Sequence, residues 1–464
     1  MPRAPRQLSS RRRPGRLPKE LRHVNLQAAG IDIGATSHFV AVPEGRDPEG
    51  HTVREFGAFT PDLHALAAWL ATCGITTVAM ESTGVYWIPL FEVLSARGFD
   101  VKLVDPRQLK HVPGRKTDVL DCQWLQQLHT FGLLAAAFRP DDAICVLRGY
   151  LRQRAMLVSC AADHIQHMQK ALEQMNVKLP EVVTDITGVT GLGIIRAIGE
   201  GERNPQVLAA LRDARCHHDE AAMARALTGT WRDEHLFALR QAVDLFDVYQ
   251  GKIAECDDAI EACLQGFADK REGDVLPPAP RTSKRPRNTP AFDVRTQLHR
   301  LTGVDLTQLD GIDGHSALKI VAEIGLDMTR WPSDKHFASW LALSPGNKIS
   351  GGKLLSSRTK ASANRVAAAL RMAASTLHHS RSALGAFFRR LKARLGAPKA
   401  ITATARKLAC LVYNMLKHGT AYVDQGQHYY EQRYQERVLS NLSRRAQDLG
   451  YQLVKASTAG SVPA

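Results

Sequence analysis

The N-terminal part of the chain switches between strand-like and helix-like patterns of hydrophobic residues. Alternating or continuously apolar runs predict five short strands, over residues 28–34, 37–42, 53–59, 76–84 and 100–104. Apolar residues three or four positions apart predict helices between these runs, over residues 61–73 and 86–97 and from Asp118 onwards. A meander of three strands followed by alternating helices and strands predicts an α/β domain on one mixed sheet.

The element order is that of a ribonuclease H-like domain, and beyond residue 142 the pattern becomes helical. Residues 143–180 and 237–267 predict two long helices. The first carries a heptad-like apolar stripe, formed by Val158, Ala161, Ile165, Met168, Leu172 and Met175. The stripe fits a coiled coil with another chain or a core packed by the second long helix. The C-terminal half is expected to be all-α, with helices over 315–325, 334–342, 361–378, 382–395 and 400–417.

Two related glycine turns precede apolar helices. Residues 186–191 read Ile-Thr-Gly-Val-Thr-Gly, and residues 309–314 read Leu-Asp-Gly-Ile-Asp-Gly. Turns of this kind expose backbone N–H groups that can hold a phosphate. Both are similar to helix-hairpin-helix elements, which predicts that the helical regions contact nucleic acid.

Composition shifts suggest where the domains end. Residues 1–24 hold eight basic residues against one acid, which predicts a disordered basic arm. Five prolines and four basic residues between positions 277 and 290 predict a linker. The expected organisation is a basic arm over 1–24, a catalytic α/β domain over 25–142, a helical coiled-coil region over 143–275, a linker over 276–292, a C-terminal domain over 293–430 and a basic tail over 431–464.

The net charge indicates which class of molecule the chain binds. The chain has 61 Lys and Arg against 46 Asp and Glu, a net charge of +15, and its isoelectric point is near 9.6. Such an excess favours a polyanionic partner, usually nucleic acid. Eight scattered cysteines without a CxxC pair argue against a zinc ribbon and favour reduced thiols in a cytosol. No apolar run approaches the ~18 residues of a membrane span, so we expect a cytoplasmic, nucleoid-associated protein without a membrane partner.

Four carboxylates lie where the predicted elements would bring them together. Asp32 interrupts the first strand, Glu81 ends the fourth, and Asp118 and Asp121 share one face at the start of a helix. The helical pair alone could be a solvated turn that complements the helix dipole. In a ribonuclease H-like sheet, however, these elements converge at one end. Four carboxylates gathered there cannot all ionise without cations, and they suit two Mg²⁺ ions that assist phosphoryl transfer.

Three motifs carry a family resemblance: residues 30–34 read Gly-Ile-Asp-Ile-Gly, residues 80–84 read Met-Glu-Ser-Thr-Gly and residues 116–121 read Lys-Thr-Asp-Val-Leu-Asp. They resemble the three motifs of the DEDD transposases of bacterial insertion sequences, whose N-terminal domain is RuvC-like. The resemblance covers about residues 24 to 427. It implies that Asp32, Glu81, Asp118 and Asp121 are the catalytic metal ligands.

The resemblance also implies a serine nucleophile in the glycine-rich loop over 343–353. In these transposases a serine of the C-terminal domain attacks DNA and forms a phosphoserine link, and Ser350 holds the matching position. Ser344, Ser356 and Ser357 are its competitors, and without the resemblance the loop is typical of a flexible surface segment. A serine nucleophile needs its proton removed and the phosphate charge offset. The expected nucleic-acid contacts are Lys116, Lys348, Lys353, Arg358, Lys360, Arg365, Arg406 and Lys407.

Residues 361–363, Ala-Ser-Ala, depart from the Gly-Asn turn that is usual in the family. With that exception the resemblance implies a transposase that cuts and rejoins donor and target DNA. It further implies a noncoding bridge RNA as guide, and a homo-oligomer, a dimer or tetramer, in which carboxylates and serine meet.

Three other classes of protein share parts of the pattern. A RuvC-like Holliday-junction nuclease would use the carboxylates alone, and a non-catalytic nucleic-acid-binding protein would use only the positive charge. Sugar kinases and actin-like ATPases share a Gly-Ile-Asp-Ile-Gly strand, but the chain has no second phosphate strand of their kind.

Overall fold

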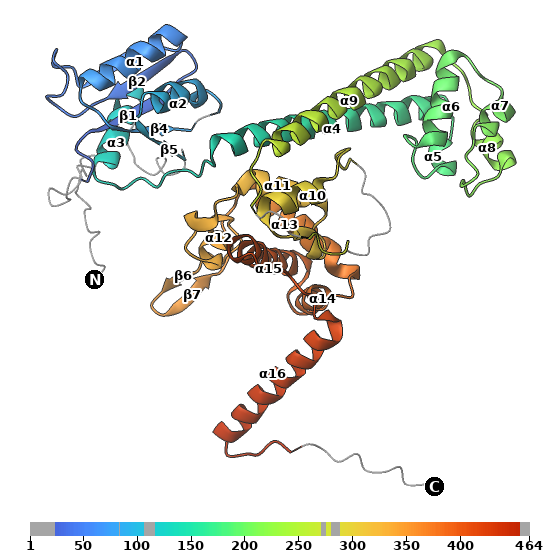
Figure 1. The fold of residues 1–464 in the computed structure, drawn as a ribbon. Coiled ribbons are helices and arrows are strands. Elements are labelled where there is room, and N and C mark those ends of the chain that lie inside the picture. The colour runs from blue at the N-terminus through green and yellow to red at the C-terminus, as the bar shows by residue number, and fades with distance from the viewer. Residues whose placement is uncertain (1–23, 83, 106–116, 271–274, 280–287, 455–464) are drawn as a thin grey trace, which may run out of the picture. The chain divides into compact units, whose positions relative to one another are not determined.

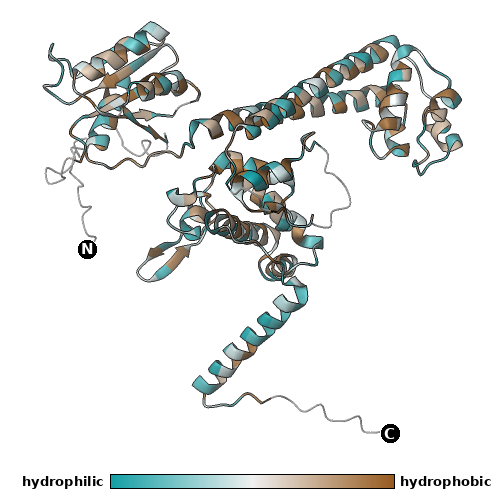
Figure 2. Cartoon of the chain, in the orientation of Figure 1, coloured by the Kyte–Doolittle hydropathy of each residue, from teal (hydrophilic) through white to brown (hydrophobic). Residues whose placement is uncertain are grey.

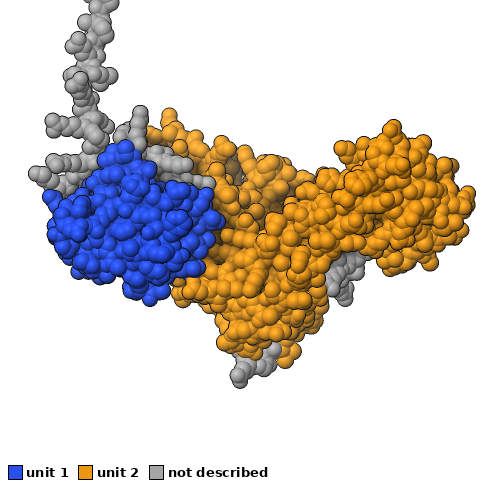
Figure 3. All heavy atoms as spheres, turned by 90° about the horizontal axis from the view of Figure 1, so that it is seen from above, with its two compact units in different colours: residues 1–139 blue, residues 140–464 orange. Residues whose placement is uncertain are grey.

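The computed structural model describes residues 24–82, 84–105, 117–270, 275–279 and 288–454. The chain divides into two compact units, residues 1–139 and residues 140–464 (Figure 3). The division falls close to the predicted end of the α/β domain at residue 142. The boundaries predicted at residues 275, 292 and 430 all lie inside the second unit.

The first unit is built on one mixed sheet. Its strands are β1 (Ala28–Ile33), β2 (Ser37–Ala41), β3 (Val53–Gly57), β4 (Thr77–Glu81) and β5 (Asp100–Val104). They lie in the order β3-β2-β1-β4-β5. The pairs β1–β2 and β2–β3 are antiparallel, whereas β1–β4 and β4–β5 are parallel. The predicted ribonuclease H-like sheet and its five strands are confirmed.

Helices cover both faces of this sheet. α1 (Thr60–Thr72) and α2 (Trp87–Ala96) lie on one face, and α3 (Asp118–Thr130) lies on the other (Figure 1). Successive side chains of a strand point to opposite faces. In β1, Ile31 and Ile33 accordingly pack in the core with α1 and α2, while Gly30 contacts α3. The same alternation turns Asp32 toward α3.

Contacts along α3 from Cys122 to His129 fix the helix against the sheet. A Cβ atom on Gly30 would lie 2.2 Å from the Gln126 backbone nitrogen and 2.4 Å from the Cys122 carbonyl oxygen. Only glycine therefore allows the helix backbone to approach β1 so closely. Farther along, Gln126 Nε2 donates to the Ala28 carbonyl at 3.4 Å, and Thr77 Oγ1 lies 2.9 Å from His129 Nε2. These contacts hold the start of α3 beside the end of β1.

We expect Gly30→Ala to displace α3 and to lower the free energy of unfolding by about 1–3 kcal/mol, because overpacking in a core costs that much. The expected metal site should be disturbed as well, since Asp118 and Asp121 are carried by the displaced helix. Thermal unfolding with and without Mg²⁺ would measure both effects.

The control for this substitution is Gly149→Ala. Gly149 lies inside a helix of the second unit, and a Cβ atom there would meet nothing within 4 Å. Alanine at an open helical position should raise stability by up to ~1 kcal/mol. A Gly30→Ala protein as stable as this control, both with and without Mg²⁺, would contradict the proposed role of close approach.

The second unit begins with a pair of long helices. α4 (Asp142–Gln174) and α9 (Asp233–Gln265) lie side by side, and four shorter helices connect their far ends (Figure 1). These are α5 (Leu179–Val182), α6 (Val189–Glu200), α7 (Pro205–Ala210) and α8 (Glu220–Ala226). The two long helices were predicted, although the first ends at Gln174 instead of continuing to residue 180.

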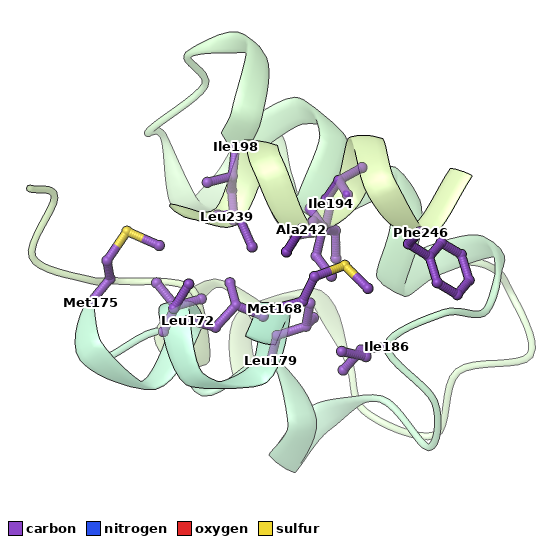
Figure 4. Close-up of a cluster of buried hydrophobic side chains, with 14 of the residues drawn as sticks. Met168, Leu172, Met175, Leu179, Ile186, Ile194, Ile198, Leu239, Ala242 and Phe246 are labelled. Carbon is purple, nitrogen blue, oxygen red and sulfur yellow. The ribbon is translucent and has the colours of Figure 1, made fainter. Parts of the chain in front are cut away.

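The heptad-like stripe of α4 is filled from within the same chain. Met168, Leu172 and Met175 are buried in a core that also contains Leu239 of α9 and Ile194 of α6 (Figure 4). Val158 and Ile165 pack against the same core. Of the two interpretations of this stripe, the structure shows the one in which the second long helix packs back on the first.

The remainder of the second unit is largely helical. Its longer helices are α10 (Val294–Thr302), α11 (Gly314–Ile324), α12 (Asp334–Trp340), α13 (Arg365–Thr376), α14 (Ala383–Leu395), α15 (Ala397–His418) and α16 (Gly426–Asp448). α15 packs against α12, α13 and α14. α16 has no buried residue, and hydrophilic side chains predominate along it (Figure 2).

The C-terminal half is largely helical, as predicted, with one correction to the sequence-based expectation. β6 (Lys348–Ser350) and β7 (Lys353–Ser356) form an antiparallel hairpin where a glycine-rich loop was expected. Gly351 and Gly352, at φ of +54° and +75°, are the two central residues of its turn. Tight hairpin turns need positive φ at both positions, so the Gly-Gly pair that indicated a loop closes two strands.

Candidate active site

The topology of the first unit gathers the four predicted carboxylates at one end of the sheet. β1 and β4 are parallel neighbours, with Ile31 opposite Met80, so Asp32 and Glu81 follow at the same edge. α3 begins at this edge. Thr117 caps it by accepting a hydrogen bond from the Leu120 backbone nitrogen, and Asp118 and Asp121 occupy the first turn.

The electrostatics of Asp32 reflect this gathering. Burial, and after it the negative charges of Glu81, Asp118 and Asp121, raise the pKa of Asp32 from 3.8 to about 6. The Cys122 thiol behind the site is also affected, since burial and the charge of Asp32 raise its pKa to about 12. The negative charges of Glu81, Asp118 and Asp121 therefore act on Asp32 at this end of the sheet.

This donor set fits divalent cations. Carboxylate oxygens are the ligands that Mg²⁺ prefers, and a cation would offset the repulsion that raises the pKa of Asp32. Among the described residues, three donor atoms lie within 4.8 Å of one another only at Asp47, Glu49 and His51.

The Asp47 group is a structural network and not a second candidate. Asp47 Oδ1 accepts from Trp69 Nε1 at 3.0 Å, and Oδ2 accepts from the His51 backbone nitrogen at 3.0 Å. Arg54 pairs with both Asp47 and Glu49. Burial would raise the pKa of Asp47, but these hydrogen bonds and the Arg54 charge outweigh it and lower the pKa. The cation that the acids need is already supplied by Arg54.

Ser350 lies in the second unit, at the tip of the β6–β7 hairpin. It is exposed, directly precedes the Gly351-Gly352 turn, and is paired with Lys353 across it. Among the described residues its hydroxyl has no hydrogen-bond partner. Of its competitors, Ser356 accepts from the Arg358 backbone nitrogen at 3.3 Å. Ile349, Leu354 and Leu355 are also exposed on this hairpin.

The positively charged residues that were predicted to contact nucleic acid lie in several separate parts of the structure. Lys348 and Lys353 flank Ser350 on the hairpin, and Lys360 is exposed beyond it. Arg365 lines a cavity of about 350 Å³ between α4, α11 and α13. Arg358, Arg406 and Lys407 line one larger cavity. Lys116 lies outside the described residues.

That larger cavity, which we call the α14–α15 groove, has a volume of about 1050 Å³. It lies between the ends of α14 and α15, the start of α12 and the base of the hairpin. Sequence reasoning found three of its cations and missed three others, Lys335, Arg394 and Lys399. The sequence did contain a signal for Lys399, because Lys399, Arg406 and Lys407 fall on one side of α15 at helical spacing.

The two glycine turns do precede helices, with different surroundings. Asp313 caps α11 by accepting from the Ser316 backbone nitrogen at 2.8 Å. Gly311, at φ of +85°, is pressed against α13, since a Cβ atom there would lie 2.5 Å from the Ala373 oxygen. Gly188 begins α6 without a side-chain cap and lines a separate cavity of about 560 Å³. Their role in phosphate binding stays a prediction.

Comparisons with known families match both units. Residues 29–177 match a sequence profile of DEDD transposases, described as a transposase of the IS110 type. Residues 305–389 match a second profile, described as transposase of the IS116/IS110/IS902 family. Together the matched ranges span half of the chain. No curated protein matches the chain, and within the described residues no helix is both long and apolar enough to cross a membrane.

Proposed function

The chain belongs to the IS116/IS110/IS902 family of transposases, and from this premise we propose how its residues divide the chemistry of DNA transposition. In this proposal Asp32, Glu81, Asp118 and Asp121 hold Mg²⁺, two ions when the site is full, and Ser350 is the covalent nucleophile. The family implies phosphoryl transfer and the use of a divalent metal. The identity of the metal, the serine step and the guide are our inferences.

The raised pKa of Asp32 is the observation that supports the metal site most directly. Burial raises this pKa most, and the negative charges of Glu81, Asp118 and Asp121 at the same end of the sheet raise it further. When bound, the metal supplies Lewis-acid activation and charge neutralisation at the phosphate. The chain itself contributes the rigid placement of its ligands, through β1, β4 and the close approach of α3.

The exposed position of Ser350 supports its role as nucleophile. In the proposed step its Oγ forms a bond to a DNA phosphorus while one backbone P–O bond breaks. The hydroxyl proton leaves Oγ, and the released DNA oxygen takes up a proton. Lys348 and Lys353 on either side of Ser350 are placed to offset the negative charge of the phosphate.

The test is strand transfer on the ends of the element with its flanking transcript and Mg²⁺. Wild type, Ser350→Ala and the matched control Ser357→Ala are compared on denaturing gels before and after protease. A protein-linked DNA end in wild type and Ser357→Ala, absent in Ser350→Ala, is the expected result. Free cleaved ends in all three would favour a RuvC-like junction nuclease that uses the carboxylates alone.

We extend the proposal to the guide and the assembly. The net charge of +15 supports binding of nucleic-acid backbones, and the family resemblance suggests a noncoding bridge RNA, donor DNA and target DNA. If a homo-oligomer, a dimer or tetramer, is the active form, mixing Asp118→Ala with Ser350→Ala chains should restore activity, because each supplies what the other lacks. Failure of such mixtures to recover any strand transfer would refute the shared site.

A further inference from the structure

The α14–α15 groove has a positively charged rim and an apolar floor. Its rim is cationic, with Lys335, Arg358, Arg394, Lys399, Arg406 and Lys407. Asp334 is the acid that lines it, and Asp334 accepts a hydrogen bond from the Cys410 thiol. In the described part of the chain none of the six cations forms an ion pair. The groove is therefore strongly attractive to an anion.

Arg406 is one of the cations that line this groove. Its Nε atom is shielded from solvent and has no hydrogen-bond partner among the described residues. A buried polar group without a partner costs free energy, and native structures keep few of them. Because Arg406 forms no ion pair among the described residues, its guanidinium can pair with an anion in the groove.

The floor of the groove is apolar. Leu343, Phe387 and Leu391 form it, with Leu395 and Pro398 near the ends of α14 and α15. Leu395 lies on this apolar floor and remains 39% exposed. A simple inorganic anion would leave this floor uncovered.

We propose that the α14–α15 groove binds a single-stranded stretch of nucleic acid, with phosphates on the cationic rim and bases against the apolar floor. This inference rests on the proposed function and extends it to a site that lies apart from Ser350. Duplex DNA stacks its bases inside the helix and presents its phosphates outward, so it would use the rim and leave the floor empty. Unstacked bases are the parts of a polynucleotide that pack on apolar and aromatic side chains.

The size of the groove agrees with this ligand. Pockets for drug-sized molecules measure about 300–1,000 Å³, and the groove reaches about 1050 Å³. It therefore has room for more than one nucleotide. The single strand could be DNA or RNA, since both present the same phosphates and base faces.

The experiment measures binding of fluorescent oligonucleotides to the full-length chain by anisotropy. Single-stranded DNA, single-stranded RNA and duplex DNA of one sequence, each about 12 nucleotides long, cover the usual length of a single-strand site. Leu395→Asn removes part of the floor without changing charge, and Leu439→Asn, at a leucine 57% exposed on α16, is the matched control. Arg406→Gln removes the cation, with Arg437→Gln on α16 as its control.

We expect Leu395→Asn to weaken single-strand binding about fivefold or more while duplex affinity changes as little as in the Leu439→Asn control. Arg406→Gln should weaken single-strand binding, and Arg437→Gln should not. A 4-thiothymidine base in the bound strand should crosslink to the peptide that contains Phe387 to Cys410. The tighter of the DNA and RNA arms identifies the source of the strand.

Equal losses of single-strand and duplex affinity in Leu395→Asn would overturn the inference, because the groove would then hold backbone alone. Unchanged binding in both groove variants would overturn it too, while leaving the transposase proposal intact. A poly-glutamate peptide that binds as tightly as single-stranded DNA would also overturn it. A wild-type chain that binds no nucleic acid would instead refute the proposed function itself.

Discussion

Asp32→Asn should abolish strand transfer and yet make the metal-free protein more stable. Activity should fall by ~10³-fold or more, because the variant loses a metal ligand and the metal contributes several kcal/mol to the transition state. Stability should rise because a buried negative charge beside Glu81, Asp118 and Asp121 is removed. The rise of its pKa from 3.8 to about 6 corresponds to ~3 kcal/mol, of which solvent screening leaves about 1–2 kcal/mol.

The stability gain should depend on pH in a defined direction. The folded state of the wild type binds a proton on Asp32 more tightly than the unfolded state does, so its stability relative to Asp32→Asn increases as pH falls from 6 toward 4. Above pH 6 the full difference should be present, and near pH 4 it should vanish. Chemical unfolding in EDTA across this range would measure it.

Added Mg²⁺ provides the counter-test. It should raise the melting temperature of the wild type and leave that of Asp32→Asn almost unchanged, because a ligand stabilises only the state that binds it. Asp62→Asn, at a carboxylate in the first turn of α1, is a matched control that should respond to Mg²⁺ like the wild type. Equal stabilisation of Asp32→Asn would place the metal elsewhere.

Much of the first unit could be predicted because its signals are local. An acid inside an apolar strand, as at Asp32, is expensive unless it has a function, and the alternation of β1 then fixes the face on which it lies. What the sequence did not reveal was how tightly α3 would pack. Nothing in the sequence distinguishes Gly30 from any other glycine in a strand. Only the structure shows that a Cβ atom there would collide with the backbone of Gln126.

The second unit was less predictable because its defining contacts are long-range. A Ser-Gly-Gly-Lys sequence indicated a loop, since β6 and β7 are too short to show a period and their residues are exposed on both faces. The α14–α15 groove joins residues from Asp334 to Cys410, and no local pattern relates the two ends of that range. The family resemblance pointed to Arg406 and Lys407 but could not show the apolar floor of the groove that they line.

Asp257→Ala should strongly destabilise the second unit. Arg154 of α4 and Asp257 of α9 form an ion pair that is only 2% and 4% exposed, and Arg154 Nη2 donates to Asp257 Oδ2 at 3.2 Å. The pair also holds the chain before α10, since Arg154 donates to the Asn288 carbonyl and Asp257 accepts from the Ala291 backbone nitrogen. Asp257→Ala leaves a buried, uncompensated guanidinium and should cost about 3–5 kcal/mol.

The double variant Arg154→Met/Asp257→Leu separates the charge from the packing. Replacing a buried pair by apolar residues of similar size is often neutral or stabilising, so this protein should recover most of the stability that Asp257→Ala loses. Denaturant unfolding, followed through the transition of the second unit, measures the stability of the double variant and of Asp257→Ala. Arg196→Met, which breaks an exposed ion pair between α6 and Asp247 of α9, should change stability by less than ~1 kcal/mol. A double variant as unstable as Asp257→Ala would show that the hydrogen bonds to Asn288 and Ala291, and not the buried charge, hold the two long helices to the C-terminal helices.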